Sequence, residues 1–143
     1  MAGSKKYLVP IDFSRNSEVA LDHALRLARD SQARLVLVHV LEDPAANVPV
    51  PMRAEYYREL QREARGAAER LIRRKKLRDR EYRFVLITQQ DPARAIAEQA
   101  RKSRVSMIIM GSHGRTGLKR IVLGSVAEKT LRHARCPVLV VKK

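Results

Sequence analysis

The chain has 143 residues, a length that suits one domain, and we expect residues 1–143 to form a single domain. No apolar run approaches the ~18 residues of a membrane-spanning helix, and the single cysteine, Cys136, excludes an internal disulfide. We therefore expect a cytoplasmic protein with no membrane partner. The formal net charge of +15 attracts anions, but the scarcity of aromatic residues argues against a face that stacks nucleic-acid bases.

Five short apolar runs predict strands at residues 7–11, 35–40, 82–87, 107–110 and 138–141. Three of these runs are continuously apolar rather than alternating, which is typical of parallel strands covered on both faces. The run at 82–87 begins with polar alternation, and this pattern predicts an edge strand.

Helical spacing fills the gaps between these runs. The longest predicted helix covers residues 54–76, and its apolar stripe begins with Tyr56 and Leu60. Residues 42–52 contain three prolines and no period, so they predict a loop. The predicted helix starts are Ser14 or Asn16 as a cap, Ala54, Asp91 with Pro92, and Ser125.

The resulting β-α-β-α-β-α-β-α-β order predicts the α/β fold class, with a doubly wound parallel five-stranded sheet and helices on both faces. In the strand order 3-2-1-4-5, the order reverses between the first and fourth strands. Ligands bind at such a reversal, at the carboxyl ends of the strands. Asp12 follows the first strand and would face this crevice, where a carboxylate could accept a ribose hydroxyl or help to hold Mg²⁺. The alternative is that Asp12 caps the following helix.

A glycine-rich segment follows the fourth predicted strand. Gly111 would let the chain turn off the strand, and Gly114 would let backbone N–H groups approach an anion. Gly124 and Ser125 would place the free N–H groups of a helix N-terminus beside that anion. We therefore predict a phosphate-binding loop.

Two better-known glycine motifs do not match this segment. Gly111 and Gly117 are one residue too far apart for a Walker loop, and Leu118 stands where that loop requires lysine. A dinucleotide-binding fingerprint should follow the first strand, where residues 12–16 contain no glycine.

The pattern Gly111-x2-Gly114-x9-Gly124-Ser125, with Asp12 and the final run at 137–141, resembles the ATP-binding branch of the universal stress protein family over essentially the whole chain. The resemblance implies the strand order 3-2-1-4-5, a role in stress response or regulation, ATP (or ADP or AMP) with Mg²⁺ as ligand, and a homodimer formed through Val138–Val141. It implies that Asp12 contacts the ribose or phosphates, and Asp12 is also the Mg²⁺ ligand that we predict from its place at the crevice. The nucleotide-binding residues that we predict are Pro10, Ile11, Asp12, Val38, Met110, Gly111, His113, Gly114, Arg115, Gly117, Gly124, Ser125 and Val126.

Several features of the sequence allow more than one interpretation. His113 either contacts phosphate or acts as an acid–base group, or it is a solvent-exposed loop histidine, whereas His39 is expected to be structural. The basic run at 73–76 is either a solvated helix face or a weak contact for nucleic acid or another polyanion. We expect ATP to be bound rather than turned over, because no general base stands beside the phosphates, and any hydrolysis to be slow and Mg²⁺-dependent. An adenylating enzyme of a related fold is the third alternative, although 143 residues leave little room for a second site.

Overall fold

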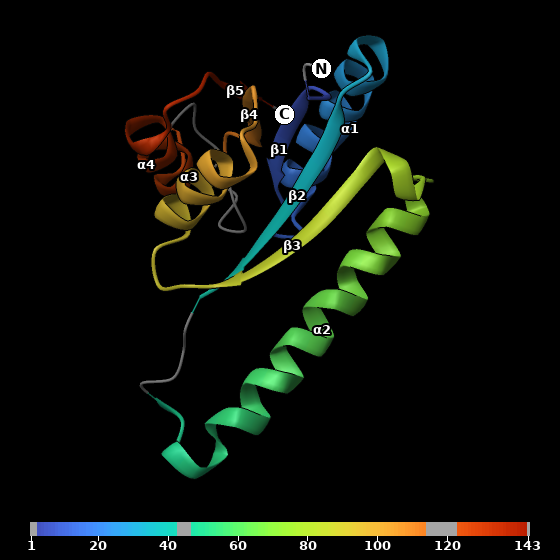
Figure 1. Cartoon of the computed structure of the whole chain (residues 1–143). Coiled ribbons are helices and arrows are strands. Elements are labelled where there is room, and N and C mark those ends of the chain that lie inside the picture. Colours follow the sequence, from blue (N-terminus) through green and yellow to red (C-terminus); the bar gives the residue numbers. More distant parts are fainter. Residues whose placement is uncertain (1–2, 43–46, 114–122, 143) are drawn as a thin grey trace.

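The computed structural model describes residues 3–42, 47–113 and 123–142, and in these residues strands alternate with helices along the chain (Figure 1). The strands are β1 (Lys6–Pro10), β2 (Arg34–Leu41), β3 (Tyr82–Thr88), β4 (Met107–Gly111) and β5 (Val138–Val141). The α-helices are α1 (Arg15–Ser31), α2 (Arg53–Arg74), α3 (Pro92–Ser103) and α4 (Ser125–His133), and the short 3-10 helices are η2 (Val50–Met52) and η3 (Asp79–Glu81).

The five strands form one parallel sheet in the order β3-β2-β1-β4-β5, which confirms the predicted fold class, the reversal between β1 and β4, and the edge position of β3. β1 ends one residue earlier than predicted. Ile11 lies outside the strand, but its N–H still donates to the carbonyl oxygen of Val38 at 2.7 Å. The chain therefore leaves the sheet immediately after Pro10.

The sheet separates two hydrophobic cores. Alternate residues of β1 enter different cores, since Tyr7 and Val9 pack with α1 while Leu8 packs with α3 and α4. The α1 side also receives Leu71 from α2. Because both faces of the central strands are covered, β1, β2 and β4 need continuous apolar runs, as their sequences have.

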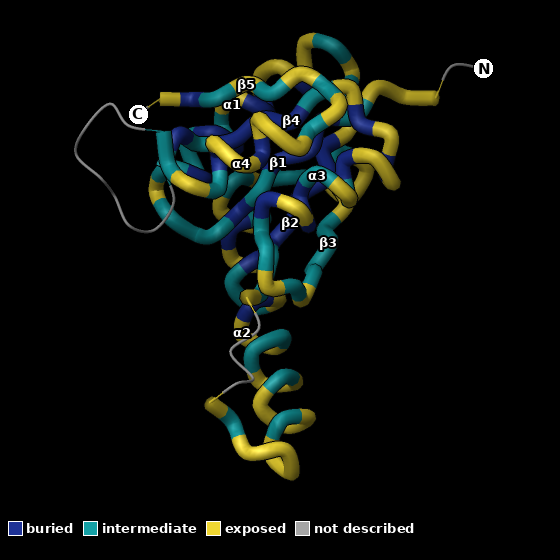
Figure 2. The backbone as a smooth tube through the Cα atoms, turned by 90° about the vertical axis from the view of Figure 1, so that its left-hand side faces the viewer, coloured by how far each residue is buried: buried dark blue, intermediate teal, exposed yellow. Residues whose placement is uncertain are grey.

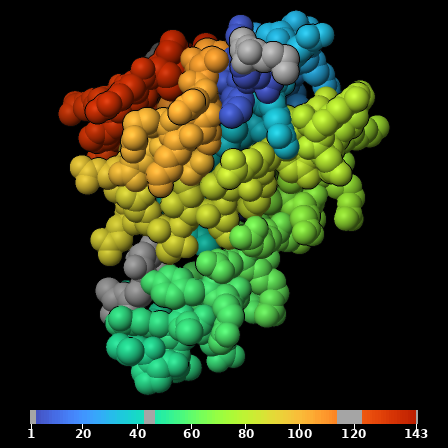
Figure 3. Space-filling model, viewed as in Figure 1, coloured from blue at the N-terminus to red at the C-terminus, as the bar shows by residue number. Residues whose placement is uncertain are grey.

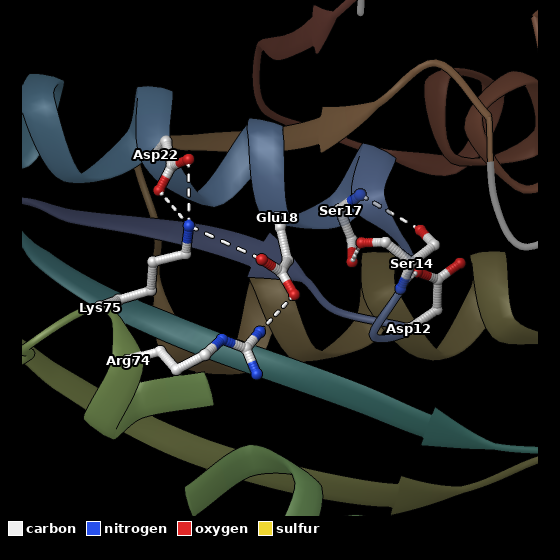
Figure 4. A network of polar contacts seen from close by, with 7 residues as sticks. All are labelled: Asp12, Ser14, Ser17, Glu18, Asp22, Arg74 and Lys75. Atoms are coloured by element: carbon white, nitrogen blue, oxygen red, sulfur yellow. Dashed lines mark hydrogen bonds and ion pairs between the residues drawn. The ribbon is translucent and has the colours of Figure 1, made fainter. Parts of the chain in front are cut away.

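The N-terminus of α1 is fixed by a short polar network (Figure 4). Of the two candidate caps, Ser14 takes the role, and its hydroxyl accepts a hydrogen bond from the Ser17 N–H at 3.2 Å. The Ser17 hydroxyl donates back to the Ser14 carbonyl at 3.0 Å. At α3, Asp91 is the cap and Pro92 the first helical residue, as predicted.

The helix α2 is attached to the sheet only along its C-terminal half. Its buried residues are Ala64, Ala68 and Leu71, and the tube in Figure 2 shows the N-terminal half projecting from the rest of the molecule with no buried residue. In the space-filling view this half forms the lower end of the molecule (Figure 3). The predicted apolar stripe therefore faces the core over only part of its length, and Tyr56 is 37% exposed.

The segment predicted as a loop before α2 contains a turn of helix. Residues 43–46 lie outside the described part of the chain, but Val50–Met52 form η2, with Pro49 before it. Val50 is 70% exposed and Met52 is 60% exposed, so η2 adds little to either core. Proline at the start of a helical turn costs no hydrogen bond, which explains why a proline-rich segment can form one.

A salt-bridge cluster joins the C-terminus of α2 to α1 (Figure 4). Lys75 Nζ lies 2.9 Å from Asp22 Oδ1 and 3.6 Å from Glu18 Oε2, and Arg74 donates a short hydrogen bond to Glu18. The Lys75 side chain is only 21% exposed. We call Glu18, Asp22, Arg74 and Lys75 the α1–α2 cluster. It adds ion pairs to the apolar contacts of Leu71 and Ile72 that hold this end of α2.

The last strand, β5, lies at the other edge of the sheet, and Leu139 on it is 38% exposed. Pairing with a second copy through this edge stays a prediction. In the part of the chain that the structure describes, none of the helices has the length and apolar character needed to cross a membrane.

We expect Lys75→Met to lower the free energy of unfolding by about 1 kcal/mol, because Lys75 pairs with two carboxylates in a partly buried site. The matched control is Arg62→Met, which breaks the α2 pair with Glu59 where the arginine side chain is 77% exposed, and it should cost less than about 0.3 kcal/mol. Urea unfolding at low and high salt measures both values. Equal losses for the two variants, or a Lys75 effect that does not shrink in salt, would contradict the stabilising role of the α1–α2 cluster.

Candidate functional site

A cavity of about 550 Å³ opens at the carboxyl ends of β1, β2 and β4, where the strand order reverses. Its size lies within the range of small-molecule sites. Residues from α1, α2, α3 and α4 complete its wall. The described residues that line it are Pro10, Ile11, Asp12, Ser17, Val38, His39, Val40, Leu41, Glu42, Tyr56, Leu60, Pro92, Ile96, Met110, Gly111, Ser112, His113, Gly124, Ser125, Val126 and Ala127.

Ten of the thirteen residues predicted from the sequence lie in this wall. They come from three strand ends and one helix start, so the fold brings together positions that are far apart in the chain. Gly114, Arg115 and Gly117 lie outside the described residues. Contact of any of these residues with a nucleotide stays a prediction.

The turn between β1 and α1 forms the floor of the cavity. The Oδ1 atom of Asp12 accepts a hydrogen bond from the Ser14 N–H at 2.9 Å. Asp12 therefore closes a local turn, and the helix cap is Ser14, so the alternative role of Asp12 as the cap is wrong. Phe13 has a φ of 65°, a left-handed backbone that costs a residue with a Cβ roughly 1–2 kcal/mol. The surrounding contacts must hold this turn in place.

Gly111 is needed for a different reason from the predicted one. It is the last residue of β4, and a Cβ on it would lie 2.9 Å from the backbone oxygen of Asn16 and 3.2 Å from the Asn16 Cβ. The absence of a side chain lets the first turn of α1 pack directly against the end of β4. Gly111 thus serves close approach between two elements rather than a sharp turn.

The N-terminus of α4 forms the wall beside β4. Its N-cap is Gly124, and no side chain caps the helix among the described residues. The Gly124 N–H donates to the Ser112 carbonyl oxygen at 2.7 Å, so it is not among the free N–H groups of this helix start. The N–H groups of the first helical turn begin at Ser125, whose hydroxyl side chain is exposed. An uncapped helix start of this kind favours negatively charged ligands.

Ser112 and His113 continue the wall from Gly111. Ser112 is buried, its N–H donates to the Val141 carbonyl oxygen at 3.1 Å, and its Oγ lies 2.9 Å from His113 Nδ1. His113 is only partly exposed and lines the cavity, which favours the ligand-facing interpretation of this residue over a solvent-exposed loop histidine. Ser112 was not predicted, although its place between Gly111 and His113 was a sufficient signal.

The opposite end of the cavity is mostly apolar. It is lined by Val40 and Leu41 at the end of β2, by Tyr56 and Leu60 on the projecting half of α2, and by Ile96 of α3, with Glu42 as the one acidic side chain among these described residues. Sequence reasoning missed these residues. The apolar stripe of α2 does not indicate that the first half of the helix extends past the edge of the sheet and forms part of a cavity wall.

His39 is another lining residue that is absent from the predicted site residues. It is 6% exposed, and its Nδ1 lies 2.6 Å from the Ile11 carbonyl oxygen, which agrees with the expected structural role. It also lines the cavity, and its ring lies 4.7 Å from the ring of Phe13. The signal for this position was its place at the carboxyl end of a central parallel strand.

The charge of the cavity differs from that of the whole chain. Among its described lining residues, Asp12 and Glu42 are acidic and none is lysine or arginine. In the described ranges, no three or more His, Cys, Asp or Glu side chains gather to hold a metal ion. Asp12 on its own fits Mg²⁺ only when phosphate oxygens and water supply the other ligands.

Cys136 lies outside this cavity, just before β5. Burial raises the pKa of its thiol, so the reactive thiolate is less populated near neutral pH than in a free cysteine. The thiol is partly buried and packs against the core that contains Ile108. These observations support the interpretation of Cys136 as a small packing residue.

The fold and the site define a small doubly wound α/β domain with a ligand-sized cavity at the point where the strand order reverses. The sequence model of the Universal stress protein family matches residues 3–142. The chain belongs to the universal stress protein family.

Two relatives from Methanocaldococcus jannaschii illustrate the similarity. Universal stress protein MJ0531 is 38% identical over 143 residues, which cover 97% of this chain and 82% of that protein. Universal stress protein MJ0577 is 33% identical over 156 residues, covering 97% and 95%. The solved structure of MJ0577 superposes with a TM-score of 0.86 at 32% identity, over 97% of this chain and 96% of that one.

Two more distant structures contain nucleotides. A universal stress protein in complex with cAMP has a TM-score of 0.62 at 24% identity and covers 99% of this chain and 98% of that one. One from Archaeoglobus fulgidus in complex with dAMP has a TM-score of 0.63 at 21% identity, covering 98% of each chain. At these identities the likeness shows the shared fold alone.

We expect Gly111→Ala to lower the free energy of unfolding by about 1–3 kcal/mol, because the added Cβ meets the rigid backbone of Asn16. The matched control is Gly66→Ala in α2, where the new Cβ lies 3.4 Å from the end of the flexible Arg70 side chain. That change should stabilise the chain by about 0.5–1 kcal/mol. Urea unfolding compares the two, and a neutral Gly111→Ala would refute the close approach.

Proposed function

We propose that this chain binds an adenine nucleotide, ATP in particular, in the cavity at the switch point. The phosphates lie at the uncapped start of α4 and beside Gly111, and the base lies toward the apolar end formed by β2 and α2. Asp12, between the two ends, accepts hydrogen bonds from the ribose hydroxyls. Within its family, the protein would act through the bound nucleotide in stress response or regulation.

The observation that carries this proposal is the difference in polarity between the two ends of this cavity. Its β4 and α4 end offers backbone N–H groups and the Ser125 hydroxyl, whereas its β2 and α2 end is lined mainly by aliphatic and aromatic side chains such as Leu41 and Tyr56, with the carboxylate of Glu42 beside them. β2 and β4 flank β1, so their ends are ~10 Å apart at the usual strand spacing. A ligand with an apolar ring at one end and an anion at the other is complementary to such a cavity.

The cAMP and dAMP complexes of distant members support the choice of adenine, because their fold is the fold of this chain. Magnesium would enter with the nucleotide, since Asp12 supplies one carboxylate and phosphate oxygens would supply the rest. When bound, the ion would neutralise phosphate charge. Binding rather than turnover is the working event in this proposal, and Asp12 orients the ribose.

We expect isothermal titration calorimetry to detect ATP binding to the wild type in the presence of Mg²⁺. Asp12→Asn should weaken that binding about tenfold, because a charge-assisted hydrogen bond becomes a neutral one while the amide oxygen can still accept from the Ser14 N–H. Asp30→Asn is the matched control, on an exposed position of α1 away from the cavity. A wild type that binds no ATP, or equal affinities in the two variants, would refute the proposal.

A second function, weak binding of a polyanion such as RNA, is favoured by one surface of α2. Arg58, Arg65 and Arg73 are exposed, lie on one helix face by their spacing, and form no ion pair with any described residue. Unpaired guanidinium groups on a chain of charge +15 attract phosphate backbones.

For this second function we expect RNA affinity to fall steeply with salt. Replacing Arg58, Arg65 and Arg73 together by glutamine should reduce the slope of log affinity against log salt by about two units, at ~0.7 per single-strand phosphate contact. The control with the same loss of charge replaces three exposed arginines on or just after α3: Arg94, Arg101 and Arg104. Filter binding at several salt concentrations measures the slopes. No binding at low salt, or the same slope in both triple variants, would contradict a specific role for the α2 face.

A further inference from the structure

His39 connects two sides of the turn that holds Asp12. Its Nδ1 lies 2.6 Å from the carbonyl oxygen of Ile11, the residue before Asp12. Because a carbonyl oxygen only accepts, Nδ1 must carry the hydrogen and donate it. The His39 ring also packs on the ring of Phe13, the residue after Asp12, with centroids 4.7 Å apart and planes inclined at 46°.

The turn needs such support because its backbone is strained. Phe13 has a φ of 65°, a left-handed conformation that a residue with a Cβ adopts only when surrounding contacts hold it there. Two other bonds act on the turn, from the Ser14 N–H to Asp12 and from the Ile11 N–H to Val38. Neither of them involves the Phe13 side chain, which His39 contacts directly.

The position of His39 links this support to the cavity. β1 ends at Pro10, which lies opposite Val38 in the register, so His39 is the first residue of β2 beyond the end of β1. It is 6% exposed and lines the cavity together with Asp12. A buried histidine at this point sets the geometry of the cavity floor.

We propose that His39 is a positioning residue of the nucleotide site. By holding the Ile11 carbonyl and the Phe13 ring at once, it fixes the Asp12 carboxylate in the orientation that accepts the ribose hydroxyls of the nucleotide. This inference rests on the proposed nucleotide binding, and it predicts that His39 governs discrimination at the sugar rather than affinity for phosphate.

The test uses the full chain and compares ATP with 2′,3′-dideoxy-ATP, which lacks both ribose hydroxyls, by isothermal titration calorimetry. The wild type should prefer ATP, and His39→Leu should lose about tenfold in ATP affinity and most of that preference, as expected when one hydrogen bond to the ligand is misplaced. A merely structural role would lower stability and leave the ratio of the two affinities unchanged. That outcome would overturn the inference.

Two further variants separate the position of the donor from the bulk of the side chain. His39→Asn keeps an N–H donor on the atom bonded to Cγ, where Nδ1 is, but loses the ring contact with Phe13, so it should retain part of the preference for ATP. His39→Gln places its donor one bond further out and should lose the preference, which gives the same information if His39→Leu does not fold. Equal ratios in the Asn and Gln variants would contradict the proposed bond to Ile11.

The controls distinguish the failure of this inference from the failure of the proposed function. His133→Asn and His133→Leu change an exposed histidine of α4 outside the cavity lining and should leave both affinities unchanged. A wild type that binds no ATP would refute the proposed function. A wild type that binds ATP and dideoxy-ATP equally would refute the positioning role alone, because Asp12 would then make no ribose contact.

Discussion

The close packing of α1 against the end of β4 is the constraint on which the site depends. Because Gly111 has no side chain, the backbone of Asn16 can approach it closely. A Cβ on Gly111 would lie only 2.9 Å from the Asn16 backbone oxygen. To bring α1 this near, the chain must leave β1 and begin a helix within a few residues. The left-handed backbone of Phe13 and the turn closed by Asp12 accomplish that reversal. The same tight turn places Asp12 across the switch point from β4. The packing of α1 and the shape of the cavity therefore depend on the same turn.

The helix α2 connects stability to the cavity in another way. Its C-terminus is held to α1 through Lys75 and Arg74, and its buried residues lie in the half near that attachment. Its N-terminal half extends past the sheet and contributes Tyr56 and Leu60 to the cavity wall. A helix attached at one end has fewer contacts to fix the other end. The apolar wall of the site is therefore supported mainly by contacts that lie well away from it.

Much of this structure could be predicted from the sequence because strong local patterns agree with the fold. Continuous apolar runs identify buried parallel strands, and signals such as Asp91-Pro92 identify helix starts. The glycine spacing and Asp12 located the cavity. What could not be predicted depends on contacts between distant segments. The packing of Gly111 on Asn16, the bond that occupies the Gly124 N–H and the contact of His39 with Ile11 each join residues with no local pattern in common. The apolar stripe of α2 likewise does not indicate which part of the helix packs on the sheet and which part extends beyond it.

The charge distribution separates the two kinds of anion binding that this chain could support. The described cavity wall contains Asp12 and Glu42 but no lysine or arginine, so in the proposed binding mode these residues would recognise phosphate through backbone N–H groups and hydroxyls in fixed positions. Such short-range bonds depend on geometry and are weakly screened by salt. Arg58, Arg65 and Arg73 of α2 are exposed to solvent, so their attraction to an anion is strongly screened. A nucleotide in the cavity should therefore stay bound at an ionic strength at which a polyanion has dissociated from the arginines of α2. The dependence of binding on salt therefore distinguishes the cavity from the basic helix surface.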